Sequence, residues 1–463
     1  MEAVLTNIVA AVNDVLWNKY LLLLFLLLGS GVYFSIRTRF VQVRKFGEGM
    51  RQVFGNISLK GKEAGKDGMS SFQALATAIA AQVGTGNIAG CASALVAGGP
   101  GAVFWMWVSA FFGMATIYSE AVLAQKYRQT GADGEVTGGP IYYIKAAFKG
   151  KLGAFMAGFF AVAIILALGF MGNMVQSNSI GEAFYTAFGV PKLVTGIVIA
   201  AVSAFIFLGG VKRIASITEK LVPLMACFYI LGSLVAIIMN YQDILPALKS
   251  IFVGAFDPQA VMGGVIGVTV KEAMRFGVAR GLFSNEAGMG STPHAHAIAK
   301  VAKPQDQGVV AMIGVFIDTF IVLTITALVI LTSGMLGTAG ADGEMLTATA
   351  LAQAAFNNSF GAFGKAFVAI CLLFFAFSTI IGWYFFGESN VKALFKGNKT
   401  VRVAYGVIAL VFIVAGSFQK VTLVWDMSDM FNGLMVIPNL LAVLALSGIV
   451  AKFAKDDHYL GDD

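Results

Sequence analysis

The stretch FQALATAIAAQVGTGNIAGCASALVA, residues 72–97, decides the fold class of this chain. It is long and apolar enough to cross a bilayer, which takes about 20 residues of helix. Its middle, AAQVGTGN at residues 80–87, nevertheless holds two glycines, a hydroxyl and two amides. A membrane helix can open its backbone only where protein or a cavity covers the freed polar groups. We therefore predict a broken transmembrane helix at this point.

The composition of the whole chain agrees with a membrane location. Hydrophobic residues make up 58% of the 463 residues and charged residues 12%, about half the roughly 25% of soluble domains. The fold class is therefore an all-α polytopic membrane protein, with the lipid bilayer as its surroundings. The net charge of +7 is too small for a nucleic-acid partner, and three cysteines in apolar stretches imply no disulfide framework.

Apolar runs bounded by charged or turn residues predict eleven transmembrane helices. These spans are 16–36, 72–97, 101–125, 153–178, 193–210, 217–239, 259–299, 308–333, 364–387, 403–418 and 431–451. The predicted inner segments hold 23 Lys and Arg residues and the outer segments three, and basic residues are retained on the cytoplasmic side. We expect a multi-pass protein of the cell (plasma) membrane, with its N-terminus outside and its C-terminus cytoplasmic.

The span at 259–299 is interrupted as well. It contains RFGVARG at residues 275–281, with glycines four residues apart. Spans two to six and seven to eleven form two sets of five, and the second set must be inverted because five is odd. Interrupted helices at matching positions of inverted halves indicate a secondary transporter with its site at mid-membrane. The alternative is that the glycines serve close helix packing.

In an inverted-repeat transporter, the chain would have three parts. Residues 1–66 would form an extra N-terminal transmembrane helix and an inner amphipathic segment. Residues 67–258 would form the first inverted repeat, with its break near 82–86, and residues 259–463 the second, with its break near 276–281. The first break would offer N–H groups near Gly86 to a carboxylate and free carbonyls to a cation or an ammonium group. A zwitterion such as an α-amino acid matches both.

Two motifs resemble the signatures of the alanine or glycine:cation symporters. They are GTGN at residues 84–87 and GLFSNEAGMGSTP at residues 281–293, and the resemblance covers nearly the whole chain. It implies the leucine-transporter fold, a 5+5 inverted-repeat core, with one extra N-terminal helix. It also implies import of alanine or glycine coupled to Na+ by alternating access. We expect no organic cofactor, no enzymatic activity and a monomer.

The resemblance also implies positions for the sodium ion. In that fold, carbonyls of the first core helix and hydroxyls of the eighth bind sodium, here the carbonyls of Ala80 and Val83 and the hydroxyls of Ser378 and Thr379. The carbonyl of Phe375 is a further expected ligand. The alternative for the two hydroxyls is a hydrogen bond to their own helix.

The substrate is expected between the two breaks. The resemblance places its carboxylate at Thr85, Gly86 and Asn87. Its ammonium group and side chain would face Ala273, Phe276 and Gly277, with Gln82 nearby. Additional wall residues are expected in the span at 153–178, namely Phe170, Asn173 and Gln176. Phe276 and Phe170 would limit the space beyond an alanine methyl.

Charged residues inside predicted spans are functional candidates because burying them in a membrane is costly. Asp318 is interpreted either as a cation or proton site or as the partner of an arginine in the span at 259–299. The charges of that span are expected to form gate or packing ion pairs, namely Lys271, Glu272, Arg275 and Arg280. Glu120 and Glu286 are expected to be structural links, and His294 and His296 lack the companions of a metal site.

Three other functions are alternatives to sodium-coupled import of a small amino acid. The nearest is the same fold with proton coupling or with another small zwitterionic solute. An ion channel is less favoured, because channels usually carry a repeated filter or charge ring around a symmetry axis. An intramembrane enzyme is not favoured, because the sequence holds neither a His-Glu-x-x-His metal motif nor a paired catalytic aspartate motif.

Overall fold

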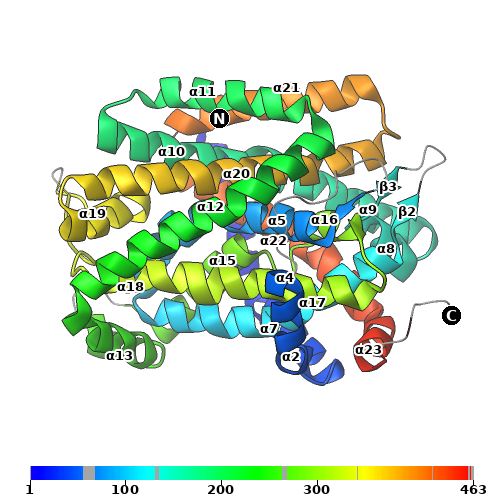
Figure 1. Cartoon of the computed structure of the whole chain (residues 1–463), viewed down its shortest axis with the longest axis horizontal. Coiled ribbons are helices and arrows are strands. Elements are labelled where there is room, and N and C mark those ends of the chain that lie inside the picture. The colour runs from blue at the N-terminus through cyan, green and yellow to red at the C-terminus, as the bar shows by residue number, and fades with distance from the viewer. Residues whose placement is uncertain are drawn as a thin grey trace.

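The long helices of this protein lie roughly side by side in one bundle (Figure 1). The computed structural model describes residues 2–55, 68–130, 135–262, 268–340, 343–419, 421–456 and 459. In this part of the chain, eight helices are long and apolar enough to cross a membrane, or nine if a bent pair is counted as one span. The expected polytopic all-α fold is therefore confirmed.

The elements follow one another in a simple order. The first part of the chain forms α1 (Glu2–Asn13), η1 (Asp14–Asn18), α2 (Leu22–Arg37), α3 (Val41–Arg44), α4 (Phe46–Gly55), β1 (Met69–Ser70), α5 (Ser71–Gln82), η2 (Gly86–Gly90), α6 (Cys91–Gly98), α7 (Gly101–Lys126), β2 (Gln129–Thr130), β3 (Val136–Thr137), α8 (Pro140–Ala147), α9 (Gly150–Ile164), η3 (Ile165–Gly172), α10 (Asn173–Phe188), α11 (Lys192–Phe207) and α12 (Gly210–Met239). Two-residue strands β2 and β3 pair antiparallel, and β1 pairs in parallel with β4.

The rest of the chain continues the bundle. It forms η4 (Tyr241–Asp243), α13 (Ile244–Gly254), α14 (Pro258–Met262), α15 (Val270–Asn285), α16 (Pro293–Ala297), β4 (Ala299–Lys300), α17 (Pro304–Val315), η5 (Phe316–Leu323), α18 (Thr324–Thr332), α19 (Ala348–Phe360), α20 (Phe363–Leu394), α21 (Lys399–Phe418), α22 (Val421–Ala445) and α23 (Ser447–Lys455). Two expected spans correspond to α11 and α15, which have only 16 residues each. The count of eleven spans therefore stays a prediction.

The break in the second expected span is present. Helix α5 begins with a capping box at Ser70 and ends at Gln82, and the helical chain resumes at η2. The axes of α5 and of the η2–α6 segment differ by 47°. The glycines, hydroxyl and amides of residues 82–87 therefore interrupt a membrane helix, as the sequence predicted.

The break in the seventh expected span lies elsewhere than predicted. Helix α15 is continuous through residues 276–281 and ends at Asn285. Glu286, Gly288 and Gly290 have positive φ values of 59°, 94° and 76°, which L side chains adopt rarely and glycine readily. The chain becomes helical again at α16. The expectation of a break near 276–281 is wrong, and the break lies at residues 286–292.

One glycine of α15, Gly277, serves helix packing instead. A Cβ on Gly277 would lie 2.5 Å from the carbonyl oxygen of Ala102 in α7. Glycine is therefore required there because it lets two helix backbones approach closely. The close-packing alternative is correct for this second motif.

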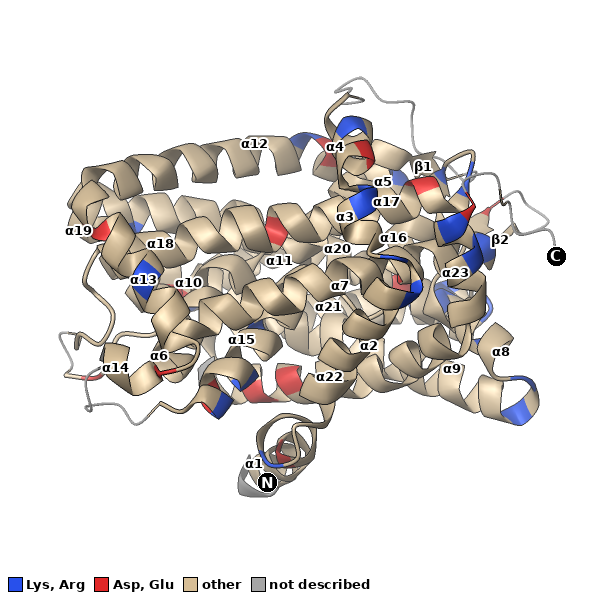
Figure 2. Ribbon diagram, turned by 90° about the horizontal axis from the view of Figure 1, so that it is seen from below, with Lys and Arg blue, Asp and Glu red and all other residues tan. Residues whose placement is uncertain are grey.

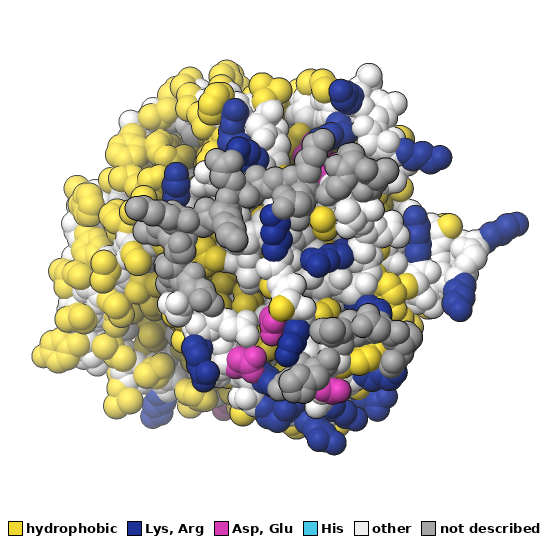
Figure 3. All heavy atoms as spheres, turned by 45° about the vertical axis from the view of Figure 1, so that its right-hand side comes forward, with side chains coloured by type: hydrophobic (Ala, Val, Ile, Leu, Met, Phe, Trp, Pro, Cys, Tyr) yellow, Lys and Arg dark blue, Asp and Glu magenta, His cyan; other side chains and the backbone are white. Residues whose placement is uncertain are grey.

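Lys and Arg residues gather at one end of the bundle, where β2, β3, α8 and α23 lie (Figures 2 and 3). We call this the basic end. Apolar side chains cover much of the remaining surface in Figure 3, and several are strongly exposed, such as Leu208 at 88% and Leu245 at 76%. An apolar belt with a charged end is the surface expected of a protein in lipid.

Candidate substrate and ion site

The break between α5 and η2 is enclosed by protein on every side. Residues 82–90 are all buried. The backbone N–H of Gly84 donates to Oδ1 of Asn87 at 2.9 Å, and that of Thr85 donates to Oε1 of Gln176 in α10 at 3.0 Å. The opened backbone is thus held by one side chain of its own turn and by one from another helix.

Three buried side-chain atoms around this break have no hydrogen-bond partner within the described part of the chain. They are Oε1 of Gln82, Oγ1 of Thr85 and Nε2 of Gln176. Nearly all buried polar atoms in proteins are paired, so each such exception calls for an explanation. An acceptor, a donor and a hydroxyl that can do either, at one broken helix, are the groups that a small polar ligand would use.

A cluster of oxygen atoms lies where α20 passes the end of α5. The hydroxyl of Thr379 donates to the carbonyls of Ala80 at 2.9 Å and Phe375 at 3.1 Å. The hydroxyl of Ser378 reaches the same two carbonyls, at 3.2 and 2.8 Å. The two hydroxyls therefore bond to their own helix and also to α5. Val83 caps the end of α5 beside this cluster.

This cluster suits a small cation. Its ligands are carbonyl and hydroxyl oxygens, and carbonyls at the end of a broken helix are the groups that bind sodium in transporters of this kind. A Cβ on Gly84 would lie 2.3 Å from Oγ1 of Thr379. Gly84 is therefore required for the close approach of the break to α20.

The side chains that reach the break from α15 are not the expected ones. A Cβ on Gly86 would lie 3.1 Å from the ring of Phe283 and 3.2 Å from Cα of Ser284. Nε2 of Gln82 donates to the carbonyl of Asn285 at 2.7 Å. The last turn of α15, just before the second break, therefore faces Gln82 and Gly86.

The expected contacts of Ala273, Phe276 and Gly277 with the first break do not form. Ala273 and Phe276 pack on Gly98 at the far end of α6, and Gly277 packs on α7. Since α15 is unbroken, residue 276 lies about 12 Å along the helix axis from residue 284. The positive-φ glycines after Asn285 were the sequence signal that could have placed this break correctly.

Phe170 packs against α21. Its ring stacks on Phe412, with 4.9 Å between centroids, and lies 5.7 Å from Tyr405. It therefore belongs to the packing of η3 against α21. The neighbouring candidate Gln176 is the residue of this segment that does reach the break.

Asp318 joins the two broken spans through hydrogen bonds. Its carboxylate accepts from Nδ2 of Asn87 at 2.7 Å and from the hydroxyls of Ser284, at 2.9 and 3.0 Å, and Thr319, at 2.8 Å. All these donors are neutral. The alternative that Asp318 pairs with an arginine of α15 is wrong for the described residues, because Arg280 pairs with Asp429 and the guanidinium of Arg275 lies over the ring of Phe276.

The second break is held by buried carboxylates. Glu120 of α7 accepts from the backbone N–H groups of Gly288 and Gly290, both at 3.0 Å, and from Nδ2 of Asn439 at 2.5 Å. Glu286 accepts from the hydroxyl of Ser291 and the indole of Trp383, both at 2.5 Å. These contacts fit the structural role expected for the two glutamates.

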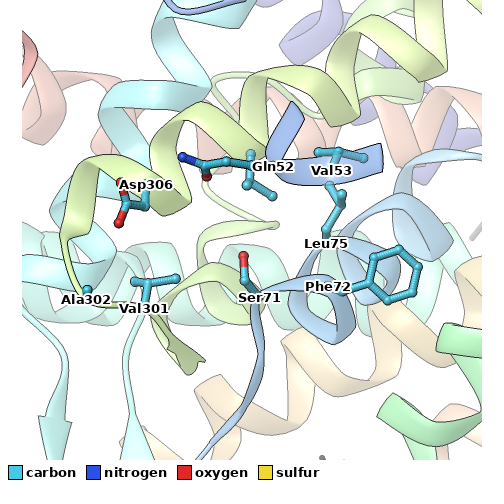
Figure 4. Close-up of a pocket in the computed structure, with 9 residues that line it drawn as sticks. Gln52, Val53, Ser71, Phe72, Leu75, Val301, Ala302 and Asp306 are labelled. Carbon is cyan, nitrogen blue, oxygen red and sulfur yellow. The ribbon is translucent and has the colours of Figure 1, made fainter. Parts of the chain in front are cut away.

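Two cavities lie toward the basic end. The larger has a volume of about 790 Å³ and is bordered by His294 and by the ion pairs of Lys392 with Glu135 and Arg402 with Glu388. The smaller, about 340 Å³, lies between α4, α5 and α17, with Ser71 and Asp306 on its wall (Figure 4). Neither is lined by residues 82–87. In the described residues, no cluster of three His, Cys, Asp or Glu side chains suits a metal ion.

The membrane fold and the enclosed break between α5 and η2 are those of a secondary transporter with the leucine-transporter fold. Two solved structures share this fold at 14% identity. One is MhsT in complex with L-phenylalanine, with a TM-score of 0.55 over 85% of this chain and 99% of that one. The other is a substrate-bound Na+-coupled sialic acid symporter, with a TM-score of 0.56 over 96% and 86%.

The chain belongs to the sodium:alanine symporter family, which matches residues 1–460. It is 43% identical to the sodium/alanine symporter AgcS of Methanococcus maripaludis, over 97% of this chain and 96% of that protein. It is 41% identical to the probable sodium/glutamine symporter GlnT of Bacillus subtilis, over 98% and 91%. The protein is therefore a sodium-coupled amino-acid symporter of the membrane and not an enzyme, as the resemblance implied.

Proposed function

We propose that this protein imports alanine and glycine with sodium, and that the substrate binds at the break between α5 and η2. The single observation that carries the proposal is the set of unpaired buried atoms of Gln82, Thr85 and Gln176 at that break. An amino acid presents one carboxylate and one ammonium group. The unpaired amide oxygen of Gln82 suits the ammonium group. The hydroxyl of Thr85, the unpaired amide N–H group of Gln176 and the backbone near Gly86 and Asn87 suit the carboxylate.

The substrate side chain is proposed to face the rings around Gly86. Phe283 lies edge-on to Trp383, at 5.5 Å between centroids, and at 4.7 Å from Trp425. Even a Cβ on Gly86 would come within 3.1 Å of Phe283. Three large rings packed at this distance leave room for a short side chain, which favours alanine and glycine over larger amino acids.

The sodium ion is proposed to bind to the carbonyls of Ala80, Val83 and Phe375 and to the hydroxyls of Ser378 and Thr379. The contacts of both hydroxyls with Ala80 support this placement. Sodium bound there would hold α5 against α20 and so order the break that takes the amino acid. Two ligands that stabilise one element favour each other's binding, which is the required coupling.

We propose that the basic end faces the cytoplasm, because basic residues near span ends are retained there. The larger cavity would then lie on the cytoplasmic side of the substrate. One chain supplies both broken spans and the oxygen cluster, which supports a monomer as the transport unit.

Uptake of labelled alanine into proteoliposomes tests the function. An inward sodium gradient should drive accumulation, choline in place of sodium should abolish it, and unlabelled glycine should compete better than leucine. Uptake that is unchanged without sodium, or that follows a pH gradient alone, would contradict sodium coupling. Leucine competing as well as alanine would contradict the proposed size limit.

The variant Thr379→Ala tests the ion site. Losing one oxygen ligand should raise the sodium concentration for half-maximal uptake about tenfold, equivalent to about 1.4 kcal/mol. The matched control is Thr332→Ala, because the hydroxyl of Thr332 is buried and bonds only to carbonyls of its own helix, those of Leu328 and Val329. Equal sodium dependence of the two variants would remove the proposed ligand.

A further inference from the structure

A buried ion pair joins α15 to α22. Nη1 and Nη2 of Arg280 donate to Oδ1 and Oδ2 of Asp429 at 2.6 and 3.0 Å. The two side chains are only 8% and 4% exposed. The guanidinium also lies over the ring of Trp425, 4.5 Å from its centroid. A buried, bidentate ion pair forms only in a narrow range of geometries, since both carboxylate oxygens must face the guanidinium.

The pair covers the substrate break on the side away from the basic end. Arg280 precedes Ser284 by four residues, so it lies about 6 Å farther from the second break along α15. A Cβ on Gly90, at the end of η2, would lie 3.6 Å from Trp425 and 4.0 Å from Arg280. To open the break toward that end of the molecule, α15 and α22 would have to separate at this pair.

The N-terminal segment holds the part of α22 that carries Asp429. Nε1 of Trp17, in η1, donates to the backbone carbonyl of Asp429 at 3.1 Å. Nδ2 of Asn13 donates to the carbonyl of Asp426, one turn earlier, at 2.9 Å. Both donors belong to buried residues, 2% exposed for Trp17 and 5% for Asn13.

The face of α22 that contacts the N-terminal segment carries a glycine, Gly433, at the point of contact. A Cβ on Gly433 would lie 2.6 Å from Leu23 and 3.3 Å from the indole nitrogen of Trp17. Glycine at this position therefore lets the indole reach the helix backbone. The contact is specific to two carbonyls of the turn that carries Asp429, and it comes from the helix that precedes the inverted-repeat core.

We propose that Trp17 and Asn13 are positioning residues for the Arg280–Asp429 pair, so that the extra N-terminal helix sets how readily the transporter closes at the end opposite the basic end. The inference rests on the proposed function, in which the site opens to each side in turn. Hydrogen bonds to Trp17 and Asn13 prevent α22 from rotating about its axis and so keep the Asp429 carboxylate facing Arg280. Without them, α22 can turn, and the closed arrangement is less populated.

Trp17→Phe tests the proposal, because it keeps an aromatic ring and removes the donor. Loss of one hydrogen bond changes the equilibrium constant between the closed and open arrangements a few-fold. We expect both KM and the maximal rate of alanine uptake to fall about threefold, since the open form is favoured and closure is harder. The control is Trp105→Phe, which also removes an indole bond to a backbone carbonyl, that of Ala255, and should change neither value.

Two results would overturn the proposal. One is a lower maximal rate with unchanged KM in Trp17→Phe, which is what a purely structural role predicts. The other is a further threefold fall in KM when Trp17→Phe is added to Asp429→Asn, because a residue that acts through the pair has no effect once the pair is gone.

Hydrogen exchange separates failure of this inference from failure of the proposed function. In purified protein, Trp17→Phe should speed amide exchange in residues 270–285 and 421–435 about threefold relative to Trp105→Phe. This measurement needs no transport, so it decides the inference even if the wild type does not carry alanine. Equal exchange in the two variants would overturn it.

Discussion

The two broken spans of this symporter are opened in different ways. The first opens over three residues between α5 and η2. Polar atoms around it bond to α10 and α20 or have no partner within the described part of the chain. The second opens over seven residues between α15 and α16, and the carboxylates of Glu120 and Glu286 accept hydrogen bonds from within it.

The difference indicates that the first break is a ligand-binding element and that the second is a structural connection between two helices. Unpaired buried acceptors and donors cost free energy until a ligand satisfies them, so the first break is suited to bind and release. In the second break, Glu120 and Glu286 accept from the N–H groups of Gly288 and Gly290 and from the hydroxyl of Ser291, and of its buried side-chain polar atoms only the hydroxyl of Thr292 has no partner within the described residues. This break is therefore suited to hold α15 and α16 at a fixed angle. The two breaks, one in each expected half of the chain, are therefore suited to different roles. Four variants test this comparison.

Glu120→Ala should have the largest effect. It leaves the N–H groups of Gly288 and Gly290 and the amide of Asn439 without their acceptor, at about 1–3 kcal/mol each. We expect a loss of about 3–9 kcal/mol of stability, measured as the thermal unfolding of the purified protein. Glu182→Ala is the control, because Glu182 pairs with Lys192 at a partly exposed site and should cost less than about 1 kcal/mol. Similar stability of the two variants would contradict the structural role of the second break.

Gly84→Ala should leave the fold largely intact and disable the ion site. Its methyl group would lie 2.3 Å from Oγ1 of Thr379, so the break must move away from α20. We expect sodium-driven alanine uptake to fall about 100-fold, equivalent to about 2.7 kcal/mol. The control Gly158→Ala adds a methyl with nothing within 4 Å. Normal sodium dependence in Gly84→Ala would show that the approach of α5 to α20 does not matter for coupling.

Asp318→Asn should weaken the link between the two breaks. The variant keeps an oxygen for Asn87 but removes the negative charge and one acceptor that Ser284 and Thr319 use. We expect about a tenfold rise in the sodium concentration for half-maximal uptake and a change in the charge moved per alanine, measured by reversal potential. An unchanged reversal potential with unchanged sodium dependence would assign Asp318 a purely structural role.

Gly281→Ala should have the smallest effect. The nearest atoms to its added Cβ belong to Met106, at 3.7–3.9 Å, and alanine favours a continuous helix by up to about 1 kcal/mol. Uptake should change less than twofold while the unfolding temperature stays level or rises. A large loss of uptake would restore residues 277–281 as a hinge, and with it the symmetric picture that the sequence suggested.

Much of the oxygen cluster proposed as the ion site followed from the sequence and the resemblance. Ala80, Ser378 and Thr379 meet as expected, because the motif at residues 84–87 and a hydroxyl pair in one apolar helix mark their places. The contact of α15 with the first break did not follow, and neither did the placing of Phe170. Paired glycines in a membrane helix indicate equally a break or a close contact, and only the neighbouring helix distinguishes them.

The sequence by itself determined the membrane fold, the first break and the sorting of basic residues to one end. These depend on composition and on local backbone chemistry, which act within one span. The tertiary structure decided which turn of α15 faces the first break, which carboxylates hold the second, and that Trp17 reaches the carbonyl of Asp429. Such contacts join residues hundreds of positions apart, and their geometry depends on how helices pack, which no local pattern specifies.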